Sequence, residues 1–467
     1  MKPGLYVYIV FISTFCFGQN KELLFNFTDI PQSLLLNPGA KVSFDKHLGV
    51  PLLSQFHFNV GIKGASVYDV FADNNTSINT KIENTLRELT RNDFVTATQQ
   101  LELFSIGWRS KKWNNKLYFS AGAYQETDLI TYIPKDFAVL AYNGNREFLN
   151  ESFKLSDFSF TGELLMVYHA GLTMNINEKF TFGARGKLYS SMFSFRSTNN
   201  RGTFITTETP EGQNFYVHQL RNIDVTVQTA GYASLLEINA PNSAVGTRQV
   251  AKQFIKRGLL GGNLGLGLDL GATYKFDPQW TLTGSILDVG FIHYTKDTEV
   301  YEAKGNYAFI GFEAPINDVE GQDLLDELEA AIPIDTLSKT YTSLRPIKLH
   351  SSLSYAFNQK DQVRCYTCKR GETIPYQDEF GLQLFSQFRP RRPIFAASLF
   401  YSKRITDLFH LKTTYTIDDY SLYNFGFLFS TNIYGFNFYI AGNHLLEYRN
   451  LAKARGASVQ LGFNLIL

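Results

Sequence analysis

The sequence contains one pair of closely spaced cysteines, and such a pair can form a disulfide, bind a metal or exchange electrons. Cys365 and Cys368 make a C-x-x-C pattern inside a polar stretch, 359–377. Zinc would need about two further ligands, and none sits at finger spacing, while haem attachment would need His in place of Lys369. We predict a local disulfide, which an oxidising compartment favours. A redox-active pair is the alternative, although the neighbouring sequence lacks a thioredoxin-like βαβ pattern.

Other residue combinations typical of catalysis are weak in this chain. His350 and Ser352 share one face of a predicted strand, but the sequence offers no third group to orient them as a hydrolytic pair. It also lacks a G-x-S-x-G elbow and a phosphate-binding lysine loop. The acidic stretch 323–332 has no alternating Asp ladder and fits a solvated helix better than a calcium loop. We therefore predict a non-enzymatic protein without catalytic residues, cofactor or metal site.

Charged residues also interrupt the small, polar faces of otherwise apolar segments. If those faces line the inside of a barrel, the charges must pair wherever water is scarce, because an unpaired buried ion is costly. We predict a salt-bridge network that fixes an internal plug to the wall, with a selectivity element for a polar solute as the alternative. The residues of this predicted lumen charge network are Glu163, Arg185, Lys187, Asp269 and Asp288.

The elements that would position these residues are β-strands, because apolar and small polar residues alternate along most of the chain. A period of two places the apolar set on one face of a strand. The counts of 41 Phe and 26 Tyr suit a lipid-facing band between aromatic girdles. We predict an all-β membrane protein, a single closed antiparallel transmembrane β-barrel. At the carboxyl end, Val459, Leu461, Phe463, Leu465 and Leu467 alternate with Ser458, Gln460, Gly462 and Asn464.

The amino terminus has the features of an export signal. Lys2 precedes an almost wholly apolar or small run, 4–17, and Cys16 and Gly18 stand at the −3 and −1 positions of a cut before Gln19. No later apolar stretch reaches the length of about 18 residues that a membrane helix needs, so a spanning chain must close as a barrel. We predict the outer membrane of a Gram-negative bacterium as the location.

The charge balance excludes one class of partner. Without Lys2, 43 basic residues stand against 43 acidic ones. Nucleic-acid binding needs a basic surface, so this balance argues against it.

Short polar turns divide the chain into a signal peptide at 1–18, an N-terminal segment at 19–51 and a barrel at 52–467. Fourteen strands are predicted, an even number that leaves both termini in the periplasm. Sixteen is the main competitor, if 215–230 and 302–312 also enter the membrane. The fourteen predicted strands span 52–66, 100–109, 116–126, 156–174, 180–196, 262–275, 280–295, 345–358, 379–389, 393–402, 408–418, 421–430, 435–443 and 454–467.

Four long extracellular loops would join the tops of these strands. They are predicted at 67–99, 127–155, 197–261 and 296–344, and they are far longer than hairpins need. The first loop carries an apolar stripe at helical spacing, which predicts a short helix. Its residues are Ile78, Ile82, Leu86 and Leu89.

Two predicted strands break their alternation at an acidic residue. In 280–295, Asp288 shares parity with the lipid-facing Ile286, and a bulge near Leu287 would turn it inward. In 100–109, Glu102 shares parity with Phe104. Either Glu102 lies near the aqueous edge of the membrane or the register of that strand differs from the simple alternation.

The N-terminal segment joins a hydrophobic triplet, Leu34 to Leu36, to the turn Asn37, Pro38 and Gly39. An apolar segment that starts in the periplasm can bury its side chains by entering the lumen of the barrel. We predict that it folds back as a plug. A periplasmic tail packed on the base of the barrel is the alternative.

Four short motifs, taken together, suggest relatives. They are LNPGA at 36–40, FGARGKL at 182–188, GLDLGATYK at 267–275 and LDVG at 287–290. Through them the chain resembles a family of uncharacterised outer-membrane β-barrels from Bacteroidota, which is similar in style to the long-chain fatty-acid transporter barrels. The resemblance implies fourteen strands with an N-terminal plug. Gly39 departs from the pattern, because related barrels more often carry Ala there.

Two functions fit these features. The first is an accessory or scaffold subunit of an outer-membrane complex for secretion, gliding or barrel assembly, because the long loops exceed what a pore requires. The second is a passive transporter of hydrophobic small molecules, as the family resemblance implies. It predicts an apolar pocket between the plug and the loops at 67–99 and 127–155, and a lateral gap where a strand kinks. The expected partners are outer-membrane lipid, protein partners in that membrane for the first function, and a hydrophobic ligand for the second.

Overall fold

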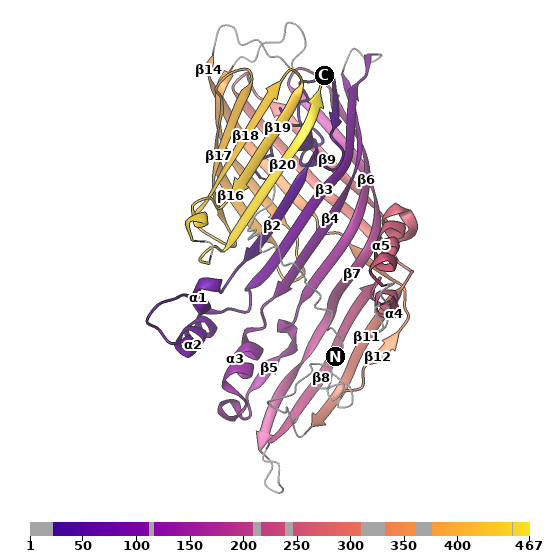
Figure 1. Ribbon diagram of the computed structural model, residues 1–467, viewed down its shortest axis with the longest axis vertical. Coiled ribbons are helices and arrows are strands. Elements are labelled where there is room, and N and C mark those ends of the chain that lie inside the picture. Colours follow the sequence, from indigo (N-terminus) through magenta and orange to yellow (C-terminus); the bar gives the residue numbers. More distant parts are fainter. Residues whose placement is uncertain are drawn as a thin grey trace, which may run out of the picture.

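A closed β-sheet dominates the computed structural model, which describes residues 22–111, 116–208, 216–238, 246–309, 332–359, 376–450 and 452–467. Twenty strands join into this sheet (Figure 1). The predicted signal peptide, the cysteine pair and nearly all of the acidic stretch 323–332 lie outside the described residues. Among the residues that are described, no helix is long and apolar enough to span a bilayer.

Fourteen wall strands form the antiparallel barrel, as the alternation predicted. β1 (Lys46–Gly49) and β2 (Phe56–Ile62) together make one interrupted wall strand, because both pair with β3 and with β20. β13 (Tyr341–Leu344) and β14 (Lys348–Gln359) make another, since both pair with β10. The other wall strands are β3 (Phe94–Arg109), β4 (Leu117–Tyr132), β6 (Phe160–Asn175), β7 (Phe180–Glu208), β9 (Asn263–Lys275), β10 (Trp280–Tyr294), β15 (Tyr376–Gln387), β16 (Ile394–Arg404), β17 (Phe409–Asp418), β18 (Asn424–Ile433), β19 (Phe436–Asn443) and β20 (Gly456–Ile466).

One wall strand, β7, belongs to two structures. Its first part pairs with β9 in the barrel, and its second part pairs with β8 (Tyr216–Ala230) beyond the barrel. β11 (Thr298–Phe309) and β12 (Asp335–Leu337) continue that sheet, and β5 (Ser152–Lys154) also pairs with β7. We call these extensions the outer lobe (Figure 1). The competing count of sixteen wall strands is therefore wrong, because the described parts of those two segments, 216–230 and 302–309, belong to the outer lobe.

The helices lie at the same end of the barrel as the outer lobe. The predicted helix in the first loop is confirmed as α2 (Ile78–Glu88), which starts after a side-chain cap by Ser77. The others are α1 (Val67–Phe71), α3 (Lys135–Asn143), α4 (Ala233–Ile238) and α5 (Gly246–Lys256). A turn of π-helix, Arg257–Gly261, follows α5 directly.

The loops are shorter than predicted because several strands continue past the apolar band. β3 begins at Phe94 and β4 ends at Tyr132, so both strands reach into the loops expected at 67–99 and 127–155. Half of the extra residues at 94–99 and 127–132 are polar, mainly Thr. Beyond the bilayer a strand needs no apolar outer face, and the alternation that predicts a membrane strand disappears there.

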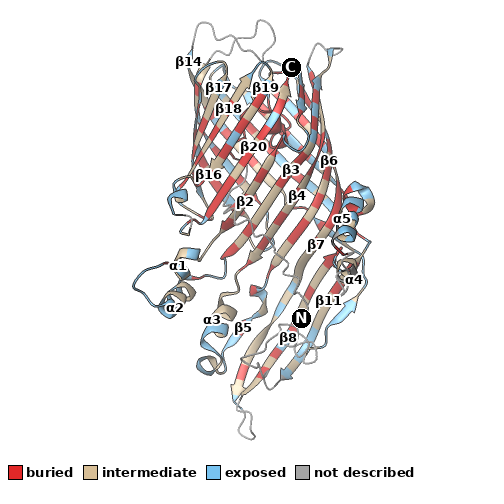
Figure 2. Ribbon diagram, viewed as in Figure 1, coloured by how far each residue is buried: buried red, intermediate tan, exposed pale blue. Residues whose placement is uncertain are grey.

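Exposure alternates along the wall strands (Figure 2). On β9, Leu266 is 58% exposed and Leu268 is 43% exposed, whereas Asp269 is fully buried. Toward the end that carries the carboxyl terminus, Tyr274 packs on Phe276 with ring centroids 5.1 Å apart, as expected of an interfacial girdle. A closed barrel with an apolar exterior belongs in the outer membrane of a Gram-negative bacterium.

Candidate functional site in the barrel lumen

The N-terminal residues 22–44 lie inside the barrel, and we call this segment the plug. Its apolar side chains are almost completely buried, with Leu24 and Ile30 at 0% exposure. They pack against inward-facing residues of the wall such as Leu287 and Leu428. A short 3-10 helix, Pro31–Leu35, starts with proline, whose fixed φ suits a helix start. The plug thus fills the middle of the lumen.

Side chains of the wall hold the plug by its backbone carbonyls. Ser285 donates a hydrogen bond to the Leu36 carbonyl at 2.6 Å, and Lys412 donates to the Phe25 carbonyl at 2.6 Å. An irregular segment has few internal partners for its carbonyl groups, and a buried carbonyl without a partner is destabilising. The wall therefore recognises the path of the plug backbone as well as its side chains.

The predicted plug turn sits directly on glycines of the wall. Asn37 Oδ1 accepts a hydrogen bond from the Gly39 amide at 2.9 Å, which closes the turn. A Cβ added to Gly183 would lie 1.9 Å from the Pro38 carbonyl oxygen, and one added to Gly271 would lie 2.1 Å from Asn37 Oδ1. At Gly39 itself, a Cβ would lie 2.3 Å from the Gly271 carbonyl oxygen. This close approach explains why position 39 carries glycine.

Four of the five charges predicted to form the lumen network meet in the structure. Lys187 Nζ lies 2.9 Å from Asp269 Oδ2 and 2.6 Å from Asp288 Oδ1. Arg185 Nη1 lies 3.3 Å from Asp269 Oδ2, and Arg185 Nη2 donates a hydrogen bond to the Leu34 carbonyl of the plug. All four side chains are buried. The cluster therefore joins β7, β9 and β10 to the plug.

A β-bulge brings Asp288 into this cluster. The pairing of β10 with β9 shifts register between Ile286 and Val289, and Asp288 has a φ of 61°. The bulge predicted near Leu287 is thus present. Lys348 Nζ lies 2.9 Å from Asp288 Oδ2 and completes the cluster. Lys348 was missed as a member, although its inward parity on the strand was visible in the sequence.

The fifth predicted charge, Glu163, joins the same network indirectly, because Lys348 Nζ also lies 3.5 Å from Glu126 Oε1. The partner of Glu163 is Arg345, which also lies 3.0 Å from Glu126 Oε1. β6 and β7 shift register between Leu164 and Leu165, and Glu163 is nevertheless buried, as Arg185 and Lys187 are. Arg345 was missed because Pro346 interrupts the wall strand there and removes the alternation that identifies a strand.

Glu102 also faces the lumen. A register shift between Glu102 and Phe104 in the pairing with β4 separates the faces of the two side chains. Glu102 Oε2 accepts a hydrogen bond from Gln32 of the plug at 2.7 Å. The expectation of a position at the aqueous edge is therefore wrong, and the alternative of a changed register holds.

The hydrolytic pair considered for His350 and Ser352 has a different environment. His350 lies against two aromatic rings, with centroid distances of 5.0 Å to Phe25 and 4.8 Å to Phe385. Both His350 and Ser352 are about 5% exposed or less. Within the described ranges, no group of three or more His, Cys, Asp or Glu residues is placed to hold a metal ion.

The lumen is sealed toward the outer lobe and hollow on the other side of the plug. Arg389 Nη2 bonds Asp128 Oδ1 at 2.9 Å across the barrel, and the Tyr420 hydroxyl lies 2.8 Å from Thr96 Oγ1. On the periplasmic side, a polar vestibule of about 530 Å³ is bordered by residues that include Asp29 of the plug. The plug and these cross-links close the route between the two ends.

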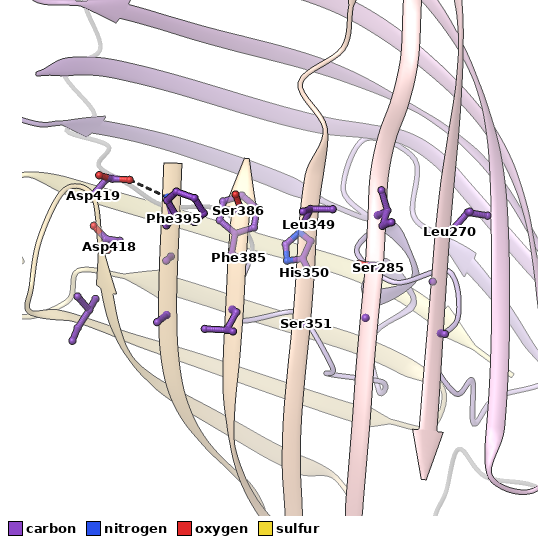
Figure 3. Close-up of a pocket in the computed structure, with 18 of the residues that line it drawn as sticks. Leu270, Ser285, Leu349, His350, Ser351, Phe385, Ser386, Phe395, Asp418 and Asp419 are labelled. Atoms are coloured by element: carbon purple, nitrogen blue, oxygen red, sulfur yellow. Dashed lines mark hydrogen bonds between the residues drawn. The ribbon is translucent and has the colours of Figure 1, made fainter. Parts of the chain in front are cut away.

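A second hollow, of about 940 Å³, lies on the outer face of the wall (Figure 3). It crosses seven neighbouring strands from β7 to β17, and exposed apolar side chains such as Leu270, Leu384 and Phe395 line it. The inward-facing Ser285 and His350 lie behind this surface and contact the plug. The hollow therefore faces lipid and is separate from the lumen.

The family of the chain is known from its sequence. The profile of DUF5723, a family of unknown function, matches residues 38–443. The chain belongs to this family. The matched region begins within the plug turn and ends with strand β19, so it covers nearly all of the wall and only the last residues of the plug. No curated protein matches the sequence.

Solved structures with similar architecture include outer-membrane channels. The toluene transporter TodX of Pseudomonas putida has a TM-score of 0.40 and 11% identity, with 94% of this chain and 92% of that chain covered. A FadL homologue of Pseudomonas aeruginosa has a TM-score of 0.39 and 11% identity, with 93% of each chain covered. The translocator domain of the autotransporter NalP from Neisseria meningitidis has a TM-score of 0.31 and 6% identity, covering 92% and 90%. The Bacteroidota origin implied by the sequence motifs stays a prediction.

Proposed function

We propose that this barrel is a passive channel for hydrophobic small molecules, with the plug as its gate. The observation that carries the proposal is an apolar cluster on the luminal wall next to the plug. Water-filled pores have polar inner walls, so an apolar inner wall suits an apolar solute. The cluster consists of Leu35 of the plug and Ala230 of the outer lobe with Tyr124, Leu165, Val167, Tyr189, Ile292 and Tyr294 of the wall.

Aromatic side chains of the outer lobe support an entry site for the same kind of solute. The ring centroids of Phe137 and Phe158 are 4.5 Å apart, and Phe153 lies 5.7 Å from Phe148 and 6.4 Å from Phe204. Such a cluster offers apolar contact before a molecule reaches the wall. The cluster and the luminal apolar patch lie on the outer side of the plug, and the polar vestibule lies beyond it.

The sequence predicted an open apolar pocket between the plug and the first two loops. In the described residues, that region is occupied by side chains of the luminal apolar cluster. The bonds of Arg389 with Asp128 and of Tyr420 with Thr96 fill the rest. The solute path therefore requires the plug or the cross-lumen bonds to move. The wall offers a kink at the same level, where the bulge at Asp288 faces the break at Arg345 and Pro346.

An accessory role in an outer-membrane complex is a second candidate, and the outer lobe favours it. The lobe extends past the barrel, and among the described strands β12 covers only Val300–Glu302 of β11. A channel for small molecules does not need such a sheet. Purification of the tagged barrel in mild detergent tests this candidate, because a complex subunit brings down stoichiometric partners.

Uptake of apolar solutes tests the channel directly. We expect a Gram-negative host that lacks its own fatty-acid transporter to take up radiolabelled oleate or toluene faster when it expresses this barrel. Uptake of a polar sugar of similar size is the control solute and should not change. Equal uptake of both apolar solutes with and without the barrel, at normal surface expression, would contradict the proposal.

A disulfide between plug and wall tests the gate. Asn26 of the plug and Thr283 of the wall are in side-chain contact at 2.9 Å, so Asn26→Cys with Thr283→Cys can cross-link them. We expect the oxidised double variant to lose most of the uptake and to regain it on reduction. Each single variant is the matched control. Full uptake by the cross-linked protein would show that the plug does not gate the route.

A further inference from the structure

Helix α5 and the turn after it lie on the outside of the barrel wall. Tyr168, at an outward position of β6, donates a hydrogen bond to the Gly258 carbonyl at 3.0 Å. Ser190 of β7 donates to the Arg257 carbonyl at 2.6 Å. Figure 1 shows α5 beside the barrel at the level where the outer lobe begins. The helix is thus placed against the lipid-facing surface and not above the lumen.

A buried arginine anchors this segment. Arg257 Nη2 lies 2.6 Å from Asp297 Oδ2, and Nη1 donates to the carbonyls of Met192 and Gly231 at 3.1 and 3.0 Å. A charge paired in this way, with its remaining protons bonded to carbonyls, fixes the position of the chain. The surface that α5 presents is therefore held in place by the wall.

The exposed side of α5 carries a basic stripe. Arg248, Lys252 and Lys256 are four residues apart, so they lie on one side of the helix. All three are exposed, and within the described part of the chain none of them forms an ion pair. We call these residues the basic stripe. They present three positive charges to whatever covers this side of the helix.

Exposed apolar residues accompany the basic stripe. Ile255 is 62% exposed, Leu259 is 68% exposed and Leu260 is 44% exposed. The chain then enters β9, where Leu264 and Leu266 are exposed on the lipid-facing side. The apolar surface of the helix end therefore continues into the surface that contacts acyl chains.

The depth of this segment follows from β9. Tyr274 marks the girdle at one interface, and Leu264 lies ten residues away along the strand. Ten residues rising about 3.3 Å each, with a tilt of about 40°, cover about 25 Å, which is the height of the apolar band. Leu264 therefore lies at the opposite edge of the band. Leu259 and Leu260 stand at the boundary between acyl chains and headgroups of the outer leaflet.

We propose that α5 is an interfacial helix that binds the phosphate groups of the outer-leaflet lipid, with the basic stripe as the headgroup site. An amphipathic helix in such a position buries its apolar residues at the acyl boundary and directs Lys and Arg to anionic headgroups. The long side chains of Lys252 and Lys256 can reach the phosphates while Ile255 and Leu259 stay in the apolar zone. The outer leaflet of a Gram-negative outer membrane supplies those phosphates in lipid A.

Lipid retention tests the headgroup site. We expect native mass spectrometry of the full-length barrel to show bound diphosphoryl lipid A and little zwitterionic phosphatidylethanolamine. Substituting Arg248, Lys252 and Lys256 together by Gln should weaken lipid A binding by at least tenfold, since each charge near an anionic surface contributes roughly fivefold. The matched control substitutes Lys154, Arg201 and Arg221 by Gln, which removes three exposed charges from the outer lobe. Undiminished binding by the stripe variant, or equal loss in the control, would overturn the proposal.

Quenching by lipid tests the depth independently. With Cys365 and Cys368 replaced by Ser, Leu259→Cys and Arg221→Cys can each carry an environment-sensitive dye. In nanodiscs that contain chain-brominated lipid, we expect strong quenching at position 259 and none at position 221. If the dye at position 259 is not quenched, α5 does not lie at the boundary between acyl chains and headgroups. Normal lipid binding by a stripe variant, together with weaker self-association than the parent protein in nanodiscs, would overturn the proposal and assign the stripe to contact with a second copy.

Discussion

At the residue scale, this lumen is defined by polar groups that each have a particular partner. Glu22 illustrates the point, since it lies deep inside the barrel at 4% exposure and accepts a hydrogen bond from Ser398 at 2.8 Å. Burial raises the pKa of this plug carboxyl to about 8, with Asp418 adding to the rise and the Ser398 bond and Lys412 opposing it. The docked plug therefore holds a proton that an undocked plug loses.

The proton on Glu22 makes plug docking dependent on pH. Because its pKa is raised in the docked state from the ordinary 4.5, its contribution is fully present below about 4.5 and is lost as the pH rises through about 8. We expect the plug to become more sensitive to protease at about pH 9 than at about pH 5. Glu22→Gln should remove this difference. The cleavage rates of the parent protein and of the variant are compared at each pH, so that the pH dependence of the protease itself cancels. An unchanged difference in the variant would refute the assignment.

Gly183 provides a second test at this scale. Gly183→Ala places a Cβ 1.9 Å from the Pro38 carbonyl oxygen, so the plug turn must shift. We expect a cost of about 1–3 kcal/mol to plug docking, as for other overpacked sites. Faster hydrogen exchange in the plug measures it. Gly186→Ala on the same strand is the control, because a Cβ there meets nothing within 4 Å; equal effects of the two variants would contradict the close contact.

At the scale of elements, the sequence predicted the wall well and the interior only in part. The alternation located fourteen strands because every outward residue in the bilayer must be apolar. The same rule says nothing about β8 and β11, which stand in water, or about Arg345, where Pro346 breaks the pattern. Glu163 belongs to the predicted network, but its links through Arg345, Glu126 and Lys348 were not predicted, because the pairing of distant strands is invisible in the sequence of any one strand.

The pair of Arg345 with Glu163 and Glu126 joins the broken wall strand to β6 and β4. Arg345→Met leaves the buried Glu163 without its cation, while Glu126 keeps Lys348, and breaking a buried pair costs about 3–5 kcal/mol. We expect the variant barrel to unfold at a clearly lower urea concentration in detergent. Lys304→Met, which removes an exposed partner of Glu302, should leave the midpoint unchanged. A stable Arg345 variant would mean that the wall holds its shape without this cross-link.

At the scale of the whole molecule, barrel closure and plug docking use different bonds. The wall closes through backbone pairing of β1 and β2 with β20, whereas the plug is held by side chains of the wall. We expect deletion of 22–44 to leave a barrel that still migrates as a folded species on unheated gels. In planar bilayers this variant should conduct ions in large steps, while the full chain should conduct little. A silent deletion variant would show that the extracellular cross-links alone close the lumen.

The junction of the two chain ends determines how such a molecule is built. Asp45 and Lys46, at the end of the plug, donate their amides to the carbonyl of Leu467 at 3.1 and 2.7 Å, so the first and last residues of the wall meet at one seam. Along the chain, the segment that occupies the lumen precedes every wall strand, and the closing strand β20 follows the other wall strands. Assembly in chain order would therefore hold residues 22–44 inside a still open sheet until β20 pairs with β1 and β2.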